Sequence, residues 1–365
     1  MNILGIESSC DETAAAVVED GCKLLSTVVQ SQINIHTLYG GVVPEVAARS
    51  HIEVINPVVN QALRDAALTW DDIDAIAVTY APGLLGSLLV GTLAARTLAI
   101  IKNKPLYPVH HVEGHVYANF IINQAPHLSF TLPSRQPDFP MLALIVSGGH
   151  SQLVLFKNHG DYELLGQTLD DAVGEAFDKV AKILGLPYPG GVSVDRAALS
   201  GDPYTYPLPK AKVQGEYNFS FSGLKTAVLR AVQRQAGVDF TFPSFQLAER
   251  LTPAQVNDFS ASFQRVAFET LVDKTAAAYH QYAPASIVIA GGVAASQALR
   301  NMLSERLPLK IEYAPIKLCT DNAAMIAALG YYYARQRAAA DPYDLEVIPS
   351  LSMTKTAWNL PTSAF

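Results

Sequence analysis

The chain has 365 residues, of which half are hydrophobic and 16% are charged, so it can form two domains or one large two-lobed body. Its net charge of −7 gives no general affinity for nucleic acid, and a nucleic-acid partner would need a local basic patch. Apolar runs such as LLGSLLVG and LALIV are too short or too interrupted by glycine to predict a membrane span.

Three scattered cysteines, Cys10, Cys22 and Cys319, form an odd set without CxxC spacing. They argue against a disulfide framework and for a reducing compartment. The first residues, MNILGIESSC, lack the basic start and long apolar stretch of a signal peptide. We therefore expect a cytoplasmic location.

The first elements are two strands around a polar turn, predicted by NILGIESSCDETAAAVVEDG at residues 2–21. Asp11 and Glu12 lie in that turn and are expected to face a ligand cleft, although an ordinary type I turn also explains them. Residues 73–100, IDAIAVTYAPGLLGSLLVGTLAARTLAI, then predict a strand, a glycine loop and a helix.

The next segment, VHHVEGHVYANF at residues 109–120, places two histidines four positions apart. On a helix His111 and His115 share one face and could bind one metal ion. Glu113 does not directly follow the first histidine, as the HExxH protease motif requires, and it points to the opposite side of the helix. The spacing therefore excludes the protease geometry but keeps a metal site, with ordinary surface or core histidines as the alternative.

The second half repeats the plan of the first half. After a proline-rich, aperiodic stretch at 124–140 that predicts a surface linker, residues 141–160 repeat strand, turn and strand, with Gly148 and Gly149 in the turn. Residues 285–307 repeat strand, glycine loop and helix. The shared order predicts two similar α/β lobes whose strand ends converge on a cleft. Each glycine turn alone is more typical of a plain turn than of a phosphate site.

Two further segments of the second half are unusual in composition. DDAVGEAFDKVAKILGLPYPGG predicts an acidic helix followed by a Pro-Gly-Gly turn. Asp178 could accept hydrogen bonds from ribose hydroxyls, with Gly190 and Gly191 allowing close backbone approach, or the helix could be an ordinary salt-bridged one. Residues 196–234 carry six basic and two acidic side chains, a local charge of +4. A solvated helix face explains that charge as well.

A carboxylate from the other lobe would be a suitable third metal ligand. KLCTDNAAMIAALG offers Asp321, directly before an alanine-rich helix, where a helix N-cap is the alternative. Two histidines and one aspartate leave coordination positions open on a metal that polarises a substrate, and iron and zinc both fit.

Taken together, these segments resemble the TsaD (Gcp, Kae) family. The resemblance rests on motifs that occur in the family's order from residue 3 to about 330: GIESSCDET, PGLLGSLLVG, HHVEGH, LIVSGGHSQL, GEAFDKVAKILGLPYPGG, FSFSGLKT, IAGGVA and LCTDNAAMIA. It implies two ribonuclease-H-like lobes of the actin, Hsp70 and hexokinase-like fold. It also implies transfer of a threonylcarbamoyl group from threonylcarbamoyl-adenylate to N6 of adenosine 37, in tRNAs that read codons beginning with A, with release of AMP.

The resemblance also assigns residues and partners. It implies a divalent metal, Fe²⁺ before Zn²⁺, on His111, His115 and Asp321. The implied donor-binding residues are Ile145, Val146, Ser147, Gly148, Gly149, Asp178, Gly191, Asp195 and Ser296. Most relatives have asparagine at the last position, and serine is shorter. Asp11 or Glu12 is the candidate for accepting a proton. The implied partners are tRNA, a TsaB-like paralogue and a TsaE-like ATPase, without a membrane. The basic stretch at 196–234 is the candidate contact for tRNA.

The implied domains are an N-terminal lobe at 1–123, a linker at 124–140 and a nucleotide-binding lobe at 141–324, with residues from about 325 to 365 packing back on the first lobe. Two alternative activities remain at this point. A sugar- or acetate-kinase-like phosphotransferase of the same fold would use ATP and magnesium and would not need the histidine pair. A zinc endopeptidase is the weaker alternative.

Overall fold

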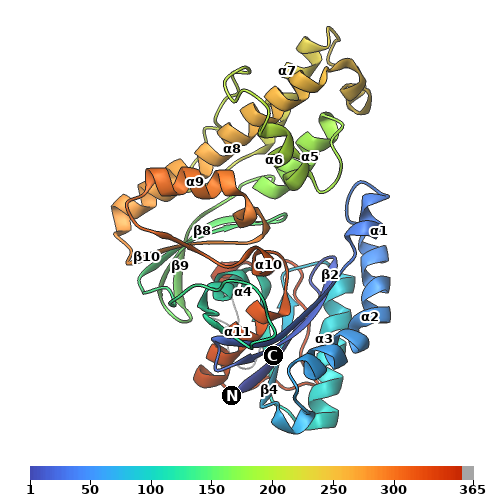
Figure 1. The fold of residues 1–365 in the computed structure, drawn as a ribbon, viewed down its shortest axis with the longest axis vertical. Helices are drawn as coiled ribbons and strands as arrows, with labels where there is room; N and C mark the ends of the chain where they lie inside the picture. Colours follow the sequence, from blue (N-terminus) through green and yellow to red (C-terminus); the bar gives the residue numbers. More distant parts are fainter. Residues whose placement is uncertain (356–365) are drawn as a thin grey trace. The chain divides into compact units, whose positions relative to one another are not determined.

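A computed structural model describes residues 1–355 of the chain, which form two compact units. Unit 1 comprises Met1–Asp138, Asn158–Asp161 and, within the described residues, the chain from Glu312 onward. Unit 2 comprises Phe139–Lys157 and Tyr162–Ile311. Each unit is built around one β-sheet (Figure 1).

Unit 1 contains a six-stranded sheet in the order β5-β4-β1-β2-β3-β6. The strands are β1 (Asn2–Glu7), β2 (Glu12–Glu19), β3 (Lys23–Ser31), β4 (Ala75–Ala81), β5 (Leu106–His110) and β6 (Asn123–Gln124). β1 pairs antiparallel with β2 and parallel with β4, so it is a central strand. Its residues after Asn2 are all buried, as expected of a strand covered by helices on both faces.

The helices of unit 1 cover both faces of this sheet (Figure 1). They are α1 (Ile33–Thr37), α2 (Pro44–Asp65), α3 (Leu85–Lys102), α4 (His111–Tyr117), α10 (Ile316–Cys319) and α11 (Ala323–Gln336), with short 3₁₀ turns at Trp70–Asp72, Ala118–Phe120 and Met353–Lys355. A Cβ on Gly5 would lie 2.3 Å from the carbonyl oxygen of Ala323 in α11. A Cβ on Gly91 in α3 would instead meet Ser8 and Ile6. Alternate residues of β1 therefore face α11 and α3.

Unit 2 contains a five-stranded sheet in the order β11-β10-β7-β8-β9. Its strands are β7 (Met141–Val146), β8 (Ser151–Asn158), β9 (Asp161–Gln167), β10 (Ser286–Ala290) and β11 (Ile311–Tyr313). Its helices are α5 (Val173–Ile183), α6 (Gly190–Ala198), α7 (Ser222–Gln235), α8 (Pro253–Tyr282) and α9 (Gln297–Arg306), with 3₁₀ turns at Ser244–Gln246, Ala248–Arg250 and Gly292–Ala295.

The two sheets confirm the duplication predicted from the sequence. β7 pairs antiparallel with β8 and parallel with β10, as β1 pairs with β2 and β4. The order β5-β4-β1-β2-β3 in unit 1 thus matches β11-β10-β7-β8-β9 in unit 2. The same strand, turn and crossover plan has produced two similar α/β sheets.

The unit boundaries differ from the predicted lobe boundaries. Residues 124–138 belong to unit 1 and not to a separate linker, because Gln124 pairs with Leu24 of β3 and Gln136 donates to the carbonyl of Phe120. Residues 312–324 also belong to unit 1 and not to the nucleotide-binding lobe. The residues after 355 in the predicted C-terminal segment lie outside the described part of the chain.

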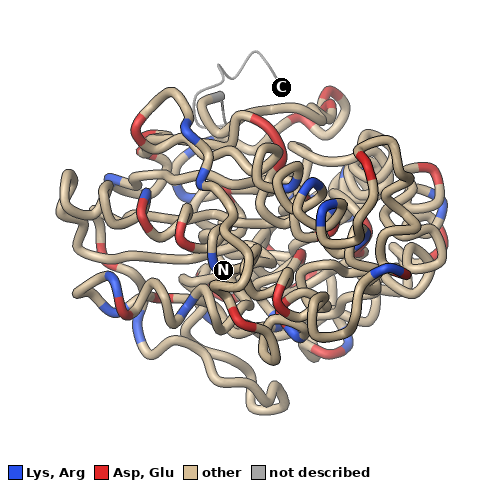
Figure 2. The backbone as a smooth tube through the Cα atoms, turned by 90° about the horizontal axis from the view of Figure 1, so that it is seen from above, with Lys and Arg blue, Asp and Glu red and all other residues tan. Residues whose placement is uncertain are grey.

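Charged residues are mixed along the chain, with Lys and Arg interspersed among Asp and Glu (Figure 2). The basic stretch at 196–234 is partly neutralised in the folded protein. Lys210 pairs with Glu269 and Asp273, and Lys225 pairs with Asp171. Its surplus charge therefore rests on the other basic side chains of the stretch.

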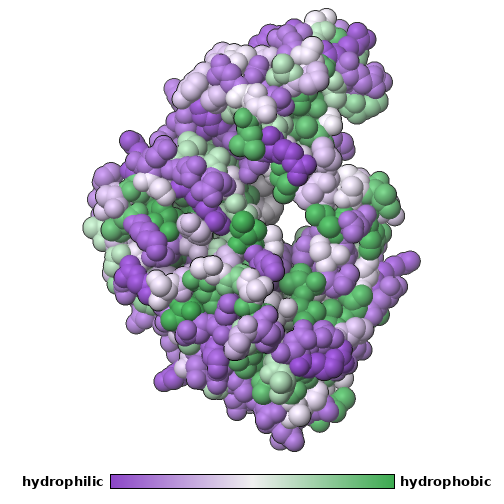
Figure 3. Space-filling model, viewed as in Figure 1, coloured by the Kyte–Doolittle hydropathy of each residue, from purple (hydrophilic) through white to green (hydrophobic). Residues whose placement is uncertain are grey.

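Helix α3 corrects the expectation that no segment is long and apolar enough to cross a membrane. By length and composition this helix passes that test, with a mean hydropathy of 1.5 over 18 residues and a third of them buried. A core helix passes the same test, and α3 buries one side in unit 1 through Ser87, Leu88, Gly91, Thr92, Ala95 and Ala99. Its exposed apolar residues are Leu85, Leu89, Leu93, Ile100 and Ile101. On the face of the molecule drawn in Figure 3, green apolar patches reach the surface among polar residues.

The turn between β8 and β9 belongs to unit 1 and carries His159. The imidazole stacks on Tyr332 with 3.9 Å between ring centroids, and its Nδ1 lies 3.0 Å from the hydroxyl of Tyr117. Burial lowers the pKa of His159 to about 4, from an ordinary 6.5. A histidine with a lowered folded pKa stabilises the fold fully above its unfolded pKa and loses that contribution as the pH falls toward the folded value.

We expect the free energy of unfolding to fall between pH 6.5 and pH 4, with His159 contributing to the loss. His159→Phe keeps an aromatic ring against Tyr332 but cannot titrate, so this variant should lose less stability over the same range. Denaturant unfolding of both proteins at several pH values measures the difference. Equal losses would show that His159 does not contribute.

Candidate active site

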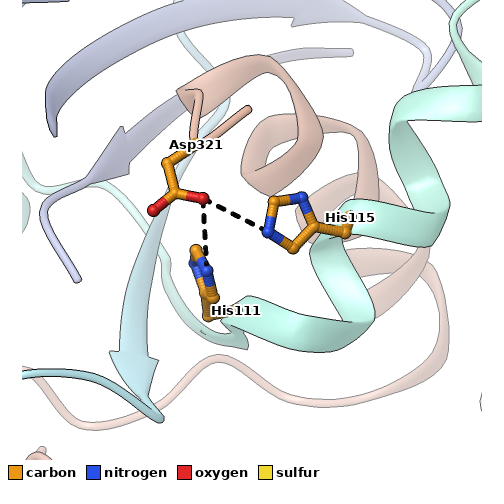
Figure 4. Close-up of side chains that lie close together, drawn as sticks. All are labelled: His111, His115 and Asp321. Carbon is orange, nitrogen blue, oxygen red and sulfur yellow. Dashed lines mark ion pairs between the residues drawn. The ribbon is translucent and has the colours of Figure 1, made fainter. Parts of the chain in front are cut away.

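Helix α4 begins at His111 and presents two histidines to one carboxylate. Nε2 of His111 lies 3.5 Å, and Nε2 of His115 3.2 Å, from Oδ1 of Asp321 (Figure 4). Both histidines are buried, and Asp321 precedes α11. The three side chains predicted as metal ligands therefore converge, with their ligand atoms within 4.8 Å of one another.

The geometry and the unsatisfied polar atoms of these residues fit a metal ion. Zinc or iron bonds of about 2.0–2.2 Å place neighbouring ligand atoms roughly 3.0–3.5 Å apart, which matches both nitrogen–oxygen distances. The ring nitrogens of His115 are buried and make no hydrogen bond to any residue of the described chain. Buried polar atoms ordinarily have partners, so this histidine is suited to a ligand that is not part of the protein.

Asp321 does not lie in the lobe expected from the sequence, and it is not the N-cap of α11. It belongs to the same unit as the two histidines and not to the other lobe, because α11 packs on β1 and carries the preceding loop with it. The N-cap of α11 is Asn322, whose Oδ1 accepts a hydrogen bond from the amide of Met325 at 3.0 Å. The carboxylate of Asp321 is therefore not needed to cap the helix.

Glu7 and Ser9 hold the other side of the His111 ring, and sequence inspection did not single them out. Nδ1 of His111 lies 3.1 Å from Oε2 of Glu7 and 3.1 Å from Oγ of Ser9. Glu7 is fully buried, accepts a hydrogen bond from the amide of Ser9 at 2.6 Å, and also contacts Thr79. A carboxylate behind a ligating histidine fixes the ring and its tautomer. The available signal in the sequence is a glutamate that directly follows the buried run ILGI at the end of strand β1.

The carboxylates give this region a surplus of negative charge. Burial lowers the pKa of His111, but Asp321 and Glu7 outweigh it and raise the value to about 9. Burial raises the pKa of Glu12 to about 9, and repulsion from Asp321 and Asp11 adds to that effect. Protons are therefore retained here at neutral pH, which is the electrostatic signature of a site that favours a cation.

Glu113 faces away from the predicted metal ligands, which confirms the helical argument against the HExxH motif. Its Oε2 accepts a hydrogen bond from the hydroxyl of Tyr333 at 3.0 Å, and the side chain is fully buried. Arg337 stacks on Tyr333 at 3.5 Å and feels the charge of Glu113. The glutamate therefore joins α4 to α11 and has a structural partner.

Glu113→Gln should retain bound metal and cost less activity than replacement of either histidine. The glutamine can still accept from Tyr333, although the lost charge leaves Arg337 less well compensated and should lower the melting temperature. Elemental analysis, and assays of the transfer reaction that the resemblance implies, test this comparison on Glu113→Gln and His115→Gln. Loss of turnover in Glu113→Gln with full metal content would assign the glutamate a catalytic role.

The donor-binding residues predicted for the second half all lie in unit 2. Ile145 and Val146 end β7, and Ser147, Gly148 and Gly149 form the turn into β8. A Cβ on Gly148 or Gly149 would meet nothing within 4 Å, so packing does not require glycine at either position. Bare backbone without a packing reason is suited to the close approach of a ligand.

The acidic helix and the Pro-Gly-Gly turn are joined by Asp178. Its Oδ1 accepts a hydrogen bond from the amide of Gly190 at 2.7 Å. A Cβ on Gly190 would lie 2.4 Å from the Cα of Asp178, so this glycine serves the packing of α6 on α5 and not the approach of a ligand. That corrects the expectation for Gly190. Gly191 has no neighbour within 4 Å of an added Cβ and remains open to a ligand.

Asp195 and Ser296 lie together, and Gln264 completes the group. Oδ1 of Asp195 accepts a hydrogen bond from Nε2 of Gln264 at 2.5 Å. Burial raises the pKa of Asp195, and the side chains of Ser296 and Gln264 oppose that rise. Gly291 packs against Val146 and Ser147, which brings the turn before Ser296 to the end of β7. Gln264 lies in the middle of α8, where no sequence signal marks it.

Comparison with known proteins decides the family. Residues 23–328 match the TsaD family, described as tRNA N6-adenosine threonylcarbamoyltransferase. The chain belongs to the TsaD family. Proteins with that description from Thermomicrobium roseum and Symbiobacterium thermophilum are 49% and 50% identical, over 95% and 96% of both chains. The Bacillus subtilis protein is 46% identical over 97% of this chain and 96% of its own.

Solved structures of low identity support the fold. HypF in a phosphate- and nucleotide-bound form matches 91% of this chain and 46% of its own, with 12% identity and a TM-score of 0.55. Component A of (R)-2-hydroxyglutaryl-CoA dehydratase from Acidaminococcus fermentans matches 92% and 100%, with 14% identity and a TM-score of 0.50. These likenesses, together with the matching strand orders of the two sheets, confirm the predicted fold of two similar α/β lobes. The chain is a transferase that modifies tRNA, and the kinase and endopeptidase alternatives are not supported.

Proposed function

We propose that the chain transfers the threonylcarbamoyl group from threonylcarbamoyl-adenylate to N6 of adenosine 37, in tRNAs that read codons beginning with A. The N6 amine attacks the carbamoyl carbon, the bond from that carbon to the phosphate oxygen of AMP breaks, and the amine loses one proton. Because the donor carries its own activation, the protein contributes mainly positioning and charge stabilisation. The convergence of His111, His115 and Asp321 is the observation that carries the proposal.

The unit 2 residues supply the proposed site for the adenylate. The open backbone of Gly148, Gly149 and Gly191 can approach the phosphate, and Asp178 and Asp195 offer carboxylate oxygens to hydroxyl groups. Ile145 and Val146 end the strand that leads into the turn. Ser296 is also proposed to contact the donor, because its buried side chain lies beside Asp195. Serine is shorter than asparagine, so it reaches the donor less far than asparagine would.

The proposed cofactor is one divalent metal on His111, His115 and Asp321, namely Fe²⁺, with Zn²⁺ as the alternative that suits the same ligands. When bound, this metal supplies positive charge to the carbamoyl oxygen. Glu7 and Ser9 orient the His111 ring. Asp11 or Glu12 is proposed to take the proton of the amine. Glu12 is half-buried and lies close enough to feel the charge of Asp321, and its pKa of about 9 means that it can accept this proton only after it ionises, which a nearby bound cation would favour.

The proposed partners are a TsaB-like paralogue and a TsaE-like ATPase, in the cytoplasm where the tRNA is modified. Leu85, Leu89 and Leu93 are exposed and spaced four apart, so they form one apolar stripe on α3. Exposed apolar stripes of this kind mark protein interfaces. The stripe supports a protein partner on this side of unit 1.

Release of AMP from labelled threonylcarbamoyl-adenylate tests the proposed reaction. With the chain and its partners present, AMP release should depend on a tRNA that carries adenosine at position 37. A matched transcript with guanosine at that position should release AMP only at the rate seen without tRNA. Equal release with both transcripts would contradict transfer to that amine.

A further inference from the structure

The surface cations of α7 differ in whether they already have an acidic partner. Lys225 is already paired with Asp171, and Lys210, which precedes the helix, is paired with Glu269 and Asp273. Arg234 makes no ion pair with any residue in the described part of the chain. A cation without a local carboxylate is the one that remains able to compensate a phosphate in a protein of net charge −7.

Arg230 and Arg234 are four residues apart and share one exposed face of α7. The guanidinium of Arg230 lies over the exposed ring of Phe240, 5.8 Å from its centroid, and donates to Gln233 at 2.9 Å. This end of the helix therefore combines arginine with an aromatic ring. Surfaces that bind single-stranded nucleic acid combine the same two groups.

Arg234 also lines a shallow pocket with an aromatic wall. The lining residues are Tyr206, Pro207, Ala231, Arg234 and Gln235. The ring of Tyr206 stacks on Phe259 with 3.6 Å between centroids and an angle of 3° between planes. Its backbone amide donates to Oγ of Ser262 at 3.2 Å. The aromatic side chain is thus fixed before any ligand arrives, which lowers the entropy cost of stacking on it.

We propose that this pocket of unit 2 binds one unpaired nucleotide of the tRNA substrate, with its phosphate on Arg234 and its base against Tyr206. Arginine binds phosphate through paired N–H donors, and unstacked bases bind aromatic rings. The exposed amide of Gln235 can donate to or accept from the edge of the base. The inference refines the expectation that the whole stretch at 196–234 contacts tRNA, and it rests on the tRNA substrate of the family.

Fluorescence anisotropy with an unmodified tRNA transcript at several salt concentrations tests the proposal. Arg234→Gln should weaken tRNA binding about fivefold or more and reduce the salt dependence by about one phosphate contact. Tyr206→Leu should weaken binding about tenfold without changing the salt slope. Tyr206→Phe retains a ring that can stack on Phe259 and should bind like the original chain.

Lys210→Gln is the matched control, because Glu269 and Asp273 already neutralise this lysine in the same stretch. Its tRNA affinity and salt slope should not change. Wild-type tRNA binding by Arg234→Gln would overturn the proposal. An Arg234→Gln variant that no longer binds a partner protein but still binds tRNA would overturn it as well. At saturating tRNA the Arg234→Gln variant should still release AMP, so failure of the pocket is distinguishable from failure of the transferase reaction.

Discussion

Replacement of Asp321 by alanine is expected to remove the bound metal and to lower transferase activity at least about a hundredfold. Its Oδ1 is the atom toward which Nε2 of both His111 and His115 points. Without it, two imidazoles remain, that of His111 beside Glu7, and they offer fewer ligands in a less complete geometry. Elemental analysis of the purified variant and a transferase assay measure the two effects.

Thr320→Ala is the control for this substitution. The side chain of Thr320 is exposed beside Asp321, and its carbonyl, which the substitution keeps, accepts the hydrogen bond from Asn322. The control should keep both metal and activity. Full metal occupancy in Asp321→Ala would remove this aspartate from the ligand set.

Gly149→Val is expected to weaken binding of a non-hydrolysable adenylate analogue at least about a hundredfold, which corresponds to about 2.7 kcal/mol. The fold leaves open space around this glycine, so the loss would come from a side chain in the path of the ligand. The melting temperature should stay close to that of the original chain. Calorimetry and thermal unfolding separate the two effects.

Gly174→Ala provides the opposite case among the glycines of this region. Its Cβ would lie 2.6 Å from the carbonyl oxygen of Ser147, so the variant should lose stability through a backbone clash. Unchanged analogue binding in Gly149→Val would contradict the assignment of the turn to the donor.

The sequence predicted those parts of the fold and site that depend on local pattern. The strand, turn and strand at 2–21 and at 141–160, and the helical spacing of His111 and His115, follow from short-range periodicity. The position of Glu113 away from the histidines follows from the same helical period, and its bond to Tyr333 confirms it.

Contacts between distant segments could not be predicted in the same way. Glu7 lies 104 residues before His111, and Gln264 lies 69 residues after Asp195, so only the folded chain brings each pair together. Which of the two units contains Asp321 depends on the packing of α11 on β1, and no sequence motif indicates that packing. Gly190 resembles a ligand-binding glycine in sequence, but the close approach it permits is to Asp178 of the same protein.

Mass spectrometry of the nucleosides from a treated tRNA tests the central claim most directly. The chain, its partners, threonylcarbamoyl-adenylate and an unmodified tRNA with adenosine at position 37 are combined, in parallel with the Asp321→Ala variant. The account predicts threonylcarbamoyladenosine at that position with the original chain and a trace at most with the variant. Equal amounts of modified nucleoside from both proteins would contradict a transferase that depends on His111, His115 and Asp321.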